Sequence, residues 1–244
     1  MKKANYERTA DNAIYLEENR YDKVKEQFKQ IADILKLDKV KRSREFSMID
    51  IGGATGEFLY YIRTLQPDMT LLVAEYSSDL VDAGNINLLK HKIPFIKADA
   101  NNLESVQSDS FDYVTTIGVT SIFDDFRPSF SEMIRIARNN AVCLNSMMVN
   151  EYGVDVIIKY INPSTGKPES GWNKFSLKSI EEFLRNHPMV SGYRFEKHIM
   201  PFDLPQRDDL MRSWTKINEC GERILWNGLN MEIAIYNIIF EVRK

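Results

Sequence analysis

Short apolar runs alternate with helical patterns between residues 46 and 145, and this alternation constrains the fold more than any other feature of the chain. Each run has the length of a buried strand, and apolar residues at helical spacing follow most of them. The predicted strands are residues 46–51, 70–74, 93–96, 111–117 and 141–145. Strands that alternate with helices form a doubly wound parallel sheet, so we predict an α/β, Rossmann-like fold.

The helices between these strands carry start and stop signals. Pro67 follows the first of them, Ser77 or Ser78 is placed to cap the second, and Pro128 lies near the start of the third. The predicted helices are residues 58–65, 77–88 and 130–137. An apolar stripe from Val24 to Leu35 also predicts a helical cap over residues 1–45.

The alternation stops near residue 150. Residues 150–175 contain many Gly, Pro and aromatic residues, which predicts an inserted lid or hairpin, and Ser176 then caps a helix that ends before Pro188. Further strands are predicted at residues 193–199, 211–217, 223–226 and 233–240. Consecutive strands without crossover helices run antiparallel, so we expect one domain over residues 1–244 whose C-terminal sheet edge is antiparallel.

Composition excludes several classes of protein. With 43% apolar residues the 244-residue chain can bury a core, and no run of about 18 apolar residues indicates a membrane span. The net charge is −3, and we interpret the one dense basic run, residues 39–44, as a solvated linker. We therefore expect neither a nucleic-acid nor a membrane partner, and the charge pattern says nothing about the oligomeric state.

The two cysteines, Cys143 and Cys220, lie far apart in the sequence and have no CxxC partner or neighbouring His. We therefore expect no metal site and no disulfide scaffold. The N-terminus lacks the apolar segment of a signal peptide, and the expected location is the reducing cytoplasm.

The most informative motif is the turn between the first predicted strand and its helix. It contains Asp50, Gly52, Gly53, Ala54 and Gly56. Glycines let a ligand approach the backbone closely, and the start of a helix offers free N–H groups. The turn alone is also compatible with a purely structural role.

Two acids follow the next two strands. Glu75 can accept hydrogen bonds from ribose hydroxyls, and Asp99 can accept one from an exocyclic adenine amine. Their neighbours Tyr76 and Ala100 belong to the same predicted site. Each acid alone is more often a solvated or capping residue, but the three features in order predict one nucleoside ligand across the edge of the sheet.

The short tail of such a ligand would cross the glycine turn toward Ile117 and Gly118, whose carbonyls can accept from an ammonium group. A dinucleotide-binding Rossmann protein is the nearest alternative. It requires a different glycine spacing, and no Lys or Arg lies between Asp50 and Tyr61 to help bind a pyrophosphate.

Residues 46–145 resemble a class I S-adenosylmethionine-dependent methyltransferase. Asp50, Gly52 and Gly56 match the acidic glycine turn of that family, and Glu75 and Asp99 fall on its ribose and adenine acids. The resemblance implies S-adenosylmethionine as cofactor and methyl transfer as activity. Ala54 stands where the family usually has its middle glycine, and the last 60 residues match only loosely.

The reaction that this resemblance implies is in-line attack on the sulfonium methyl group, which needs alignment but no metal or protein nucleophile. The overall arrangement also resembles bacterial methyltransferases of small-molecule and surface-polysaccharide biosynthesis, so we expect O- or N-methylation of a small molecule. The fourth strand lacks the Asn/Asp-Pro-Pro-aromatic loop of nucleic-acid amino methylation. Methylation of a protein or RNA partner, and a non-catalytic cofactor-binding module, remain as alternatives.

Candidate acceptor residues come from several segments, and each of them can also be interpreted as a purely structural residue. The aromatic candidates serve either the acceptor or local packing, Asn145 either the acceptor or nearby backbone groups, and His198 is either a general base or a plain surface residue. The candidates are Tyr15, Tyr21, Asn145, Tyr152, Trp172 and His198.

Overall fold

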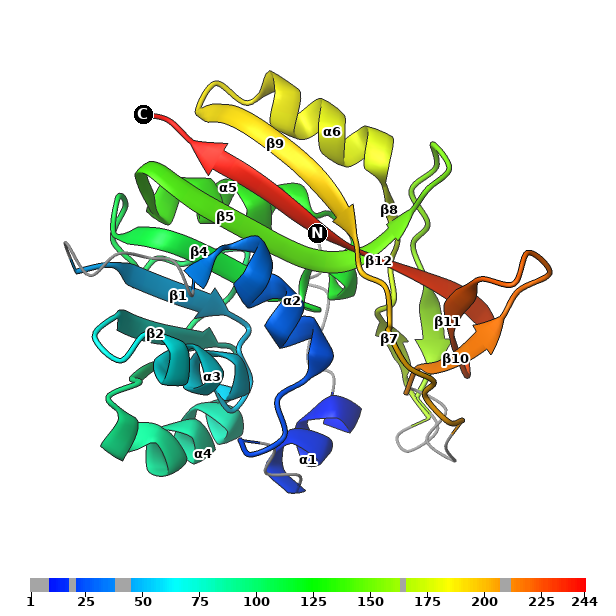
Figure 1. Cartoon of the computed structure of the whole chain (residues 1–244), viewed down its shortest axis with the longest axis horizontal. Helices are drawn as coiled ribbons and strands as arrows, with labels where there is room; N and C mark the ends of the chain where they lie inside the picture. The colour runs from blue at the N-terminus through cyan, green and yellow to red at the C-terminus, as the bar shows by residue number, and fades with distance from the viewer. Residues whose placement is uncertain (1–8, 18–20, 38–44, 163–165, 207–211) are drawn as a thin grey trace.

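The structure, a computed structural model, describes residues 9–17, 21–37, 45–162, 166–206 and 212–244 (Figure 1). The basic run at residues 39–44 lies outside the described residues, as does Met211 at the start of a predicted strand.

One half of the main sheet is parallel, as predicted. Its strands, in spatial order, are β3 (Phe95–Lys97), β2 (Thr70–Glu75), β1 (Ser47–Ile51), β4 (Phe111–Ile117) and β5 (Ala137–Asn150). Each neighbouring pair among them is parallel. Every residue of β1 is buried, because this strand has partners on both sides and helices over both faces.

The C-terminal strands form the antiparallel edge that the sequence predicts. β12 (Met231–Val242) pairs antiparallel with β5, with β9 (Val190–Lys197) and with β11 (Arg223–Asn227). β11 in turn pairs antiparallel with β10 (Trp214–Ile217). The two-residue β8 (Phe175–Ser176) adds a short parallel pair beside β5. The prediction of a mixed sheet is therefore confirmed.

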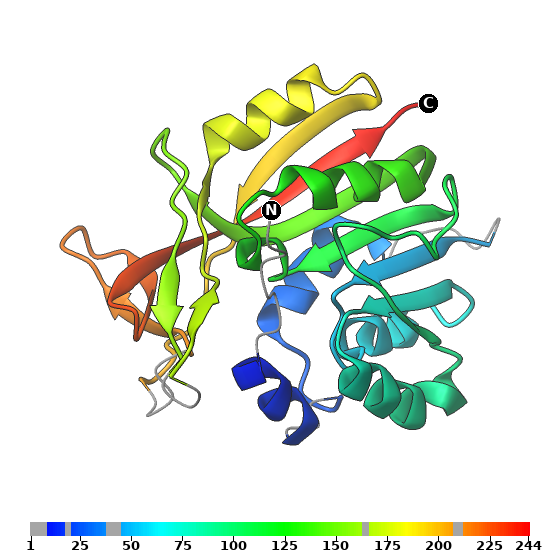
Figure 2. The same ribbon diagram turned by 180° about the vertical axis from the view of Figure 1, so that it is seen from behind.

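Helices cover both faces of this sheet (Figures 1 and 2). α2 (Glu26–Ile34) and α3 (Glu57–Leu65) lie over one face, where Phe28 and Phe58 join the core. α5 (Arg127–Ile136) and α6 (Leu177–Asn186) lie over the other face, where Phe130 and Ile180 are fully buried. Two further helices, α1 (Thr9–Glu17) and α4 (Ser78–Leu88), contact each other.

A small outer lobe projects from one end of the sheet, to the right in Figure 1. We define it as the hairpin of β6 (Lys159–Ile161) and β7 (Pro168–Ser170), the hairpin of β10 and β11, and the ends of β5 and β12 that carry them. Its core is a separate cluster around Trp172, Leu225 and Ile233.

Several predicted boundaries are wrong. The strand predicted at 141–145 runs from Ala137 to Asn150. β4 pairs with Ala137 and residues 142–146, β12 pairs with residues 141–149, and β8 pairs with the last two residues. The preceding helix accordingly ends at Ile136. Pairing with β12 places β9 at Val190–Lys197 instead of 193–199. β3 begins only at Phe95, since the preceding proline has no N–H to donate.

No helix within the described ranges is both long and apolar enough to cross a membrane.

We expect Phe126 to be a principal stabilising residue of the α5–α6 face. Its ring is fully buried and lies 5.1–5.7 Å from the ring centroids of Phe130, Phe175 and Phe183. Phe126→Ala should lower the free energy of unfolding by about 3–5 kcal/mol, because it removes a large side chain from a packed core. Urea denaturation measures this loss. The half-exposed Phe202 provides the control, and a similar loss in Phe202→Ala would contradict the assignment.

Candidate cofactor and active site

The glycine turn joins the end of β1 to the start of α3 in a conformation that demands small residues. Gly52 and Gly56 have φ values of +71° and +84°, and a Cβ at Gly56 would lie 2.6 Å from the Phe95 ring. Ala54 also adopts a left-handed conformation, with φ of +49°. Such a conformation costs an L-residue about 1–2 kcal/mol, so the turn is strained at the position where the sequence departs from glycine.

Glu75 anchors this turn to the end of β2. One carboxylate oxygen accepts from the Ala54 N–H at 3.0 Å, and the other accepts from the N–H groups of Tyr76 and Ser77 at 2.8 and 2.9 Å. Burial raises the pKa of the Glu75 carboxyl, and these three backbone donors oppose the rise. The carboxylate is thus held at the mouth of the turn with capacity left to accept from a ligand.

Asp50 lies behind the turn. Its carboxylate accepts from the Thr115 hydroxyl at 2.8 Å, and a Cβ on Gly53 would lie 2.8 Å from its other oxygen. Burial, with a further contribution from Glu75, raises the pKa of Asp50 to about 7, although the Thr115 bond lowers it. Asp50 therefore supports the turn from behind.

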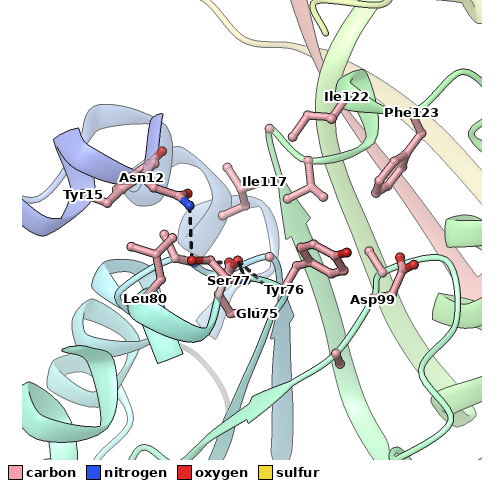
Figure 3. A pocket seen from close by; sticks show the side chains of 16 residues that line it. Asn12, Tyr15, Glu75, Tyr76, Ser77, Leu80, Asp99, Ile117, Ile122 and Phe123 are labelled. Carbon is pink, nitrogen blue, oxygen red and sulfur yellow. Dashed lines mark hydrogen bonds between the residues drawn. The ribbon is translucent and has the colours of Figure 1, made fainter. Parts of the chain in front are cut away.

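A pocket opens in front of the turn, between α1 and the C-terminal ends of the parallel strands (Figure 3). Glu75 lies at its floor, with Tyr15 and Asn12 of α1 on one side and Tyr76, Asp99 and Phe123 on the other. Its lining residues are Asn12, Tyr15, Gly52, Ala54, Glu75, Tyr76, Ser77, Leu80, Ala98, Asp99, Ala100, Ile117, Gly118, Val119, Ile122 and Phe123.

Most of the residues predicted for the cofactor meet in this pocket. Those that line it are Gly52, Ala54, Glu75, Tyr76, Asp99, Ala100, Ile117 and Gly118. Asp50, Gly53 and Gly56 instead support the turn from behind. Asp99 accepts from the Asn101 N–H at 2.9 Å through one oxygen, which holds its carboxylate at the pocket wall.

Sequence reasoning missed several lining residues. Ser77, Ala98 and Val119 adjoin predicted residues, so extending each motif by one position would have found them. Ile122 and Phe123 lie on or just after the 3₁₀ turn η3 (Thr120–Ile122), and no local signal marks them.

Asn12 is a further residue that the sequence does not indicate. Its side chain donates to the Ser77 hydroxyl at 3.2 Å and so links α1 to the start of α4. Ser77 stands at the N-cap position of α4, but its hydroxyl makes no capping hydrogen bond.

Among the predicted acceptor residues, only Tyr15 lines the pocket. The Tyr21 hydroxyl donates to the Thr55 carbonyl at 2.7 Å, and partial burial raises its pKa. Asn145 is fully buried and donates to the Thr120 hydroxyl at 2.7 Å. Tyr21 and Asn145 therefore brace elements that surround the pocket.

The remaining acceptor candidates lie in or beside the outer lobe. Tyr152 is 80% exposed, whereas Trp172 is buried in the lobe core. The expectation that His198 is a surface residue is wrong. It is 6% exposed and lies 2.6 Å from the Gln30 amide oxygen, because α2 covers this end of the sheet. Burial lowers the pKa of His198, which favours the neutral ring.

The pocket has the chemistry of a site for a nucleoside. Two carboxylates, Glu75 and Asp99, are separated by apolar walls, and no Lys, Arg or His is among the described residues that line it. Carboxylates suit ribose hydroxyls and an adenine amine, whereas a pyrophosphate would be repelled. The residues present therefore fit S-adenosylmethionine.

Comparison with known proteins agrees with this geometry. A family model described as a methyltransferase domain matches residues 42–170, which is more than half of the chain. The demethylmenaquinone methyltransferase of Roseiflexus sp. (strain RS-1) is 30% identical over 93 residues, which cover 38% of this chain and 39% of that protein. The match thus spans about two fifths of the relative's length.

Solved structures share the fold. The YcgJ protein of Bacillus subtilis superposes with a TM-score of 0.58 and 14% identity, over 88% of this chain and 99% of that chain. The CurJ carbon methyltransferase superposes with a TM-score of 0.58 and 10% identity, over 98% of this chain and 59% of that chain.

We expect Glu75 to dominate cofactor affinity. Glu75→Ala removes the acceptor for ribose hydroxyls and releases the turn, so binding of S-adenosylhomocysteine should weaken at least about tenfold, or about 1.4 kcal/mol. Calorimetric titration measures the affinity, and circular dichroism checks the fold. Asp79, an exposed acid in α4, is the control, and Asp79→Ala should bind as the wild type does. Unchanged affinity in Glu75→Ala would overturn the assignment.

Asp50 should make the stability of the ligand-free protein depend on pH. Its folded pKa of about 7 exceeds the ordinary aspartate pKa of 3.8, so between these values the folded state holds a proton that the unfolded state has released. Its contribution to stability is complete below the unfolded pKa and is lost as the pH rises through the folded pKa. As the pH rises from about 5 to about 6, the free energy of unfolding of the wild type should therefore fall by up to about 1.4 kcal/mol because of Asp50. Urea unfolding at several pH values measures this free energy. Asp50→Asn should lack the fall, and equal slopes of the free energy of unfolding against pH in the two proteins would refute the prediction.

Proposed function

The chain belongs to the methyltransferase domain family, and on that premise we propose that it transfers the methyl group of S-adenosylmethionine to a small-molecule acceptor. One observation supports the proposal above all others. The glycine turn, Glu75 and Asp99 meet in one pocket at the carboxyl ends of the parallel strands, the edge at which ligands bind in open α/β sheets.

The chain's own residues supply binding and alignment. Glu75 accepts hydrogen bonds from a ribose, Asp99 accepts one from an adenine amine, and the apolar walls near Tyr76 and Phe123 cover the base. When bound, S-adenosylmethionine supplies an electrophilic methyl group on a positively charged sulfur. Ile117 and Gly118 lie at the end of the pocket reached by the tail, and the Gly118 N–H is bonded to the Ser146 carbonyl at 2.8 Å. This bond fixes the backbone there.

The outer lobe supports a small acceptor. It extends β5 and β12 beyond the rest of the sheet, on the side where the acceptor would approach, and it has a core of its own around Trp172. We propose that its two hairpins border the space in which the acceptor binds. A net charge of −3 gives little support to a polyanionic partner such as RNA.

We propose two acceptor classes. The first is a sugar derivative methylated on O or N, and it rests on the resemblance of the sequence to enzymes of bacterial surface-polysaccharide biosynthesis. The second is a quinone-type acceptor, and it rests on the similarity to a demethylmenaquinone methyltransferase. We place the sugar derivative first, and a comparative assay separates the two.

The cofactor comes first in the test. S-adenosylhomocysteine should raise the melting temperature, with micromolar affinity equivalent to about −7 to −8 kcal/mol, and NAD should not. Stabilisation by NAD alone would overturn the proposal.

The acceptor comes second. The protein is incubated with methyl-labelled S-adenosylmethionine and, separately, with sugar nucleotides, reduced quinones, a metabolite extract, total protein and RNA. At a cofactor concentration near the wild-type dissociation constant, label should enter a small molecule in wild type and several-fold more slowly in Glu75→Ala. Label in protein or RNA instead would identify a macromolecular substrate, and cofactor binding without transfer to any fraction would favour a binding module.

A further inference from the structure

The pocket wall formed by Ile122 and Phe123 is held in place from outside the pocket. Both residues lie on or just after η3, which has only three residues and little stability of its own. The Thr120 hydroxyl accepts from the Asn145 side chain at 2.7 Å, and the Ser121 hydroxyl accepts from the Met148 N–H at 3.0 Å. Both of these bonds come from β5.

A third support comes from the inserted segment. The Asn173 N–H donates to the Ser121 carbonyl at 2.8 Å, and its side-chain NH₂ donates to the Phe123 carbonyl at 2.6 Å. Its side-chain oxygen accepts from the Ile158 N–H at 2.7 Å. Asn173 is fully buried but does not line the pocket. It therefore joins the inserted segment to the backbone of the wall residue Phe123 and of Ser121, which directly precedes the wall.

The conformation of the neighbouring residue, Trp172, indicates that the position of Asn173 is tightly constrained. Trp172 has φ of +63°, a left-handed conformation that is unfavourable for a bulky side chain. Its indole is buried in the core of the outer lobe. A strained conformation persists only where its surroundings enforce it, and such residues cluster at functional sites.

A polar cluster reinforces the join nearer the surface. The Lys159 ammonium lies 2.6 Å from an Asp124 carboxylate oxygen, which also accepts from the Ser170 hydroxyl at 2.8 Å. Asp124 directly follows the wall residue Phe123, while Lys159 and Ser170 lie on β6 and β7. These hydrogen bonds lower the pKa of Asp124 despite the opposing effect of partial burial, which keeps its charge in place.

We infer that Asn173 is a positioning residue for the cofactor, through which the inserted segment sets the wall against which the nucleoside rests. The inference depends on the proposed function only in taking this pocket as the cofactor site. It implies that the lobe expected to receive the acceptor and the pocket expected to hold the cofactor are mechanically joined, so that a displacement of one alters the other.

The test uses the full chain, with S-adenosylhomocysteine as probe. Asn173→Asp keeps the acceptor for Ile158 but removes the donor to Phe123 and places a negative charge beside its carbonyl. Asn162→Asp is the matched control, because it is the same substitution at a residue whose side chain donates to Glu169 within the β6–β7 hairpin. The dissociation constant should rise at least about tenfold in Asn173→Asp and stay within about twofold in Asn162→Asp.

A local readout distinguishes positioning from general weakening of the fold. Amide hydrogen exchange of residues 119–124 should quicken in Asn173→Asp and not in Asn162→Asp, under conditions where both remain folded. If Asn173→Asp does not fold, Asp124→Ala, at an exposed residue, tests the inference instead. Its affinity for S-adenosylhomocysteine should fall about threefold. Unchanged affinity in the variant that folds, or equal losses in Asn173→Asp and the control, would overturn the inference. Failure of the wild type to bind would instead refute the proposed function.

Discussion

The Glu75 carboxylate is the interaction on which the rest of the site depends. It ends a buried parallel strand and accepts three backbone N–H groups, one from the glycine turn and two from Tyr76 and Ser77, which directly precede α4. Glu75 is only 8% exposed, and so buried a carboxylate would be costly without such donors. One side chain thus fixes the mutual placement of β2, the turn after β1 and α4, and places negative charge at the pocket.

This dependence explains which parts of the molecule can be predicted from sequence. β1 is fully buried and β2 and β4 are largely buried, so these strands read as continuous apolar runs, and the residues at their ends follow directly. β5 was predicted too short because its first residues, Arg138 to Asn140, are exposed and polar. None of these three residues has a partner in β4 or β12, and Asn140 has a left-handed φ of +64°, so they form a bulge that the local sequence does not mark as strand.

The residues of the site can be predicted only where a local sequence pattern marks them, as it does for the strands. Glu75 and Asp99 stand at strand ends and could be found by counting along the chain. Asn12, Phe123 and Asn173 act through contacts with segments that are distant in sequence, such as the 3.2 Å bond from Asn12 to Ser77. His198 was misjudged because nothing near it in sequence shows that α2 covers it. Long-range packing decided these positions.

Ala54 shows how the turn tolerates its departure from glycine. The residue holds a left-handed φ of +49°, which disfavours any side chain larger than hydrogen. Its N–H nevertheless donates to Glu75, and a charge-assisted hydrogen bond is among the stronger interactions available to a backbone group. That bond holds Ala54 in the conformation that the ligand-binding turn requires. A single methyl group therefore costs folding energy, and the carboxylate proposed to receive the ribose is the same group whose hydrogen bond offsets that cost.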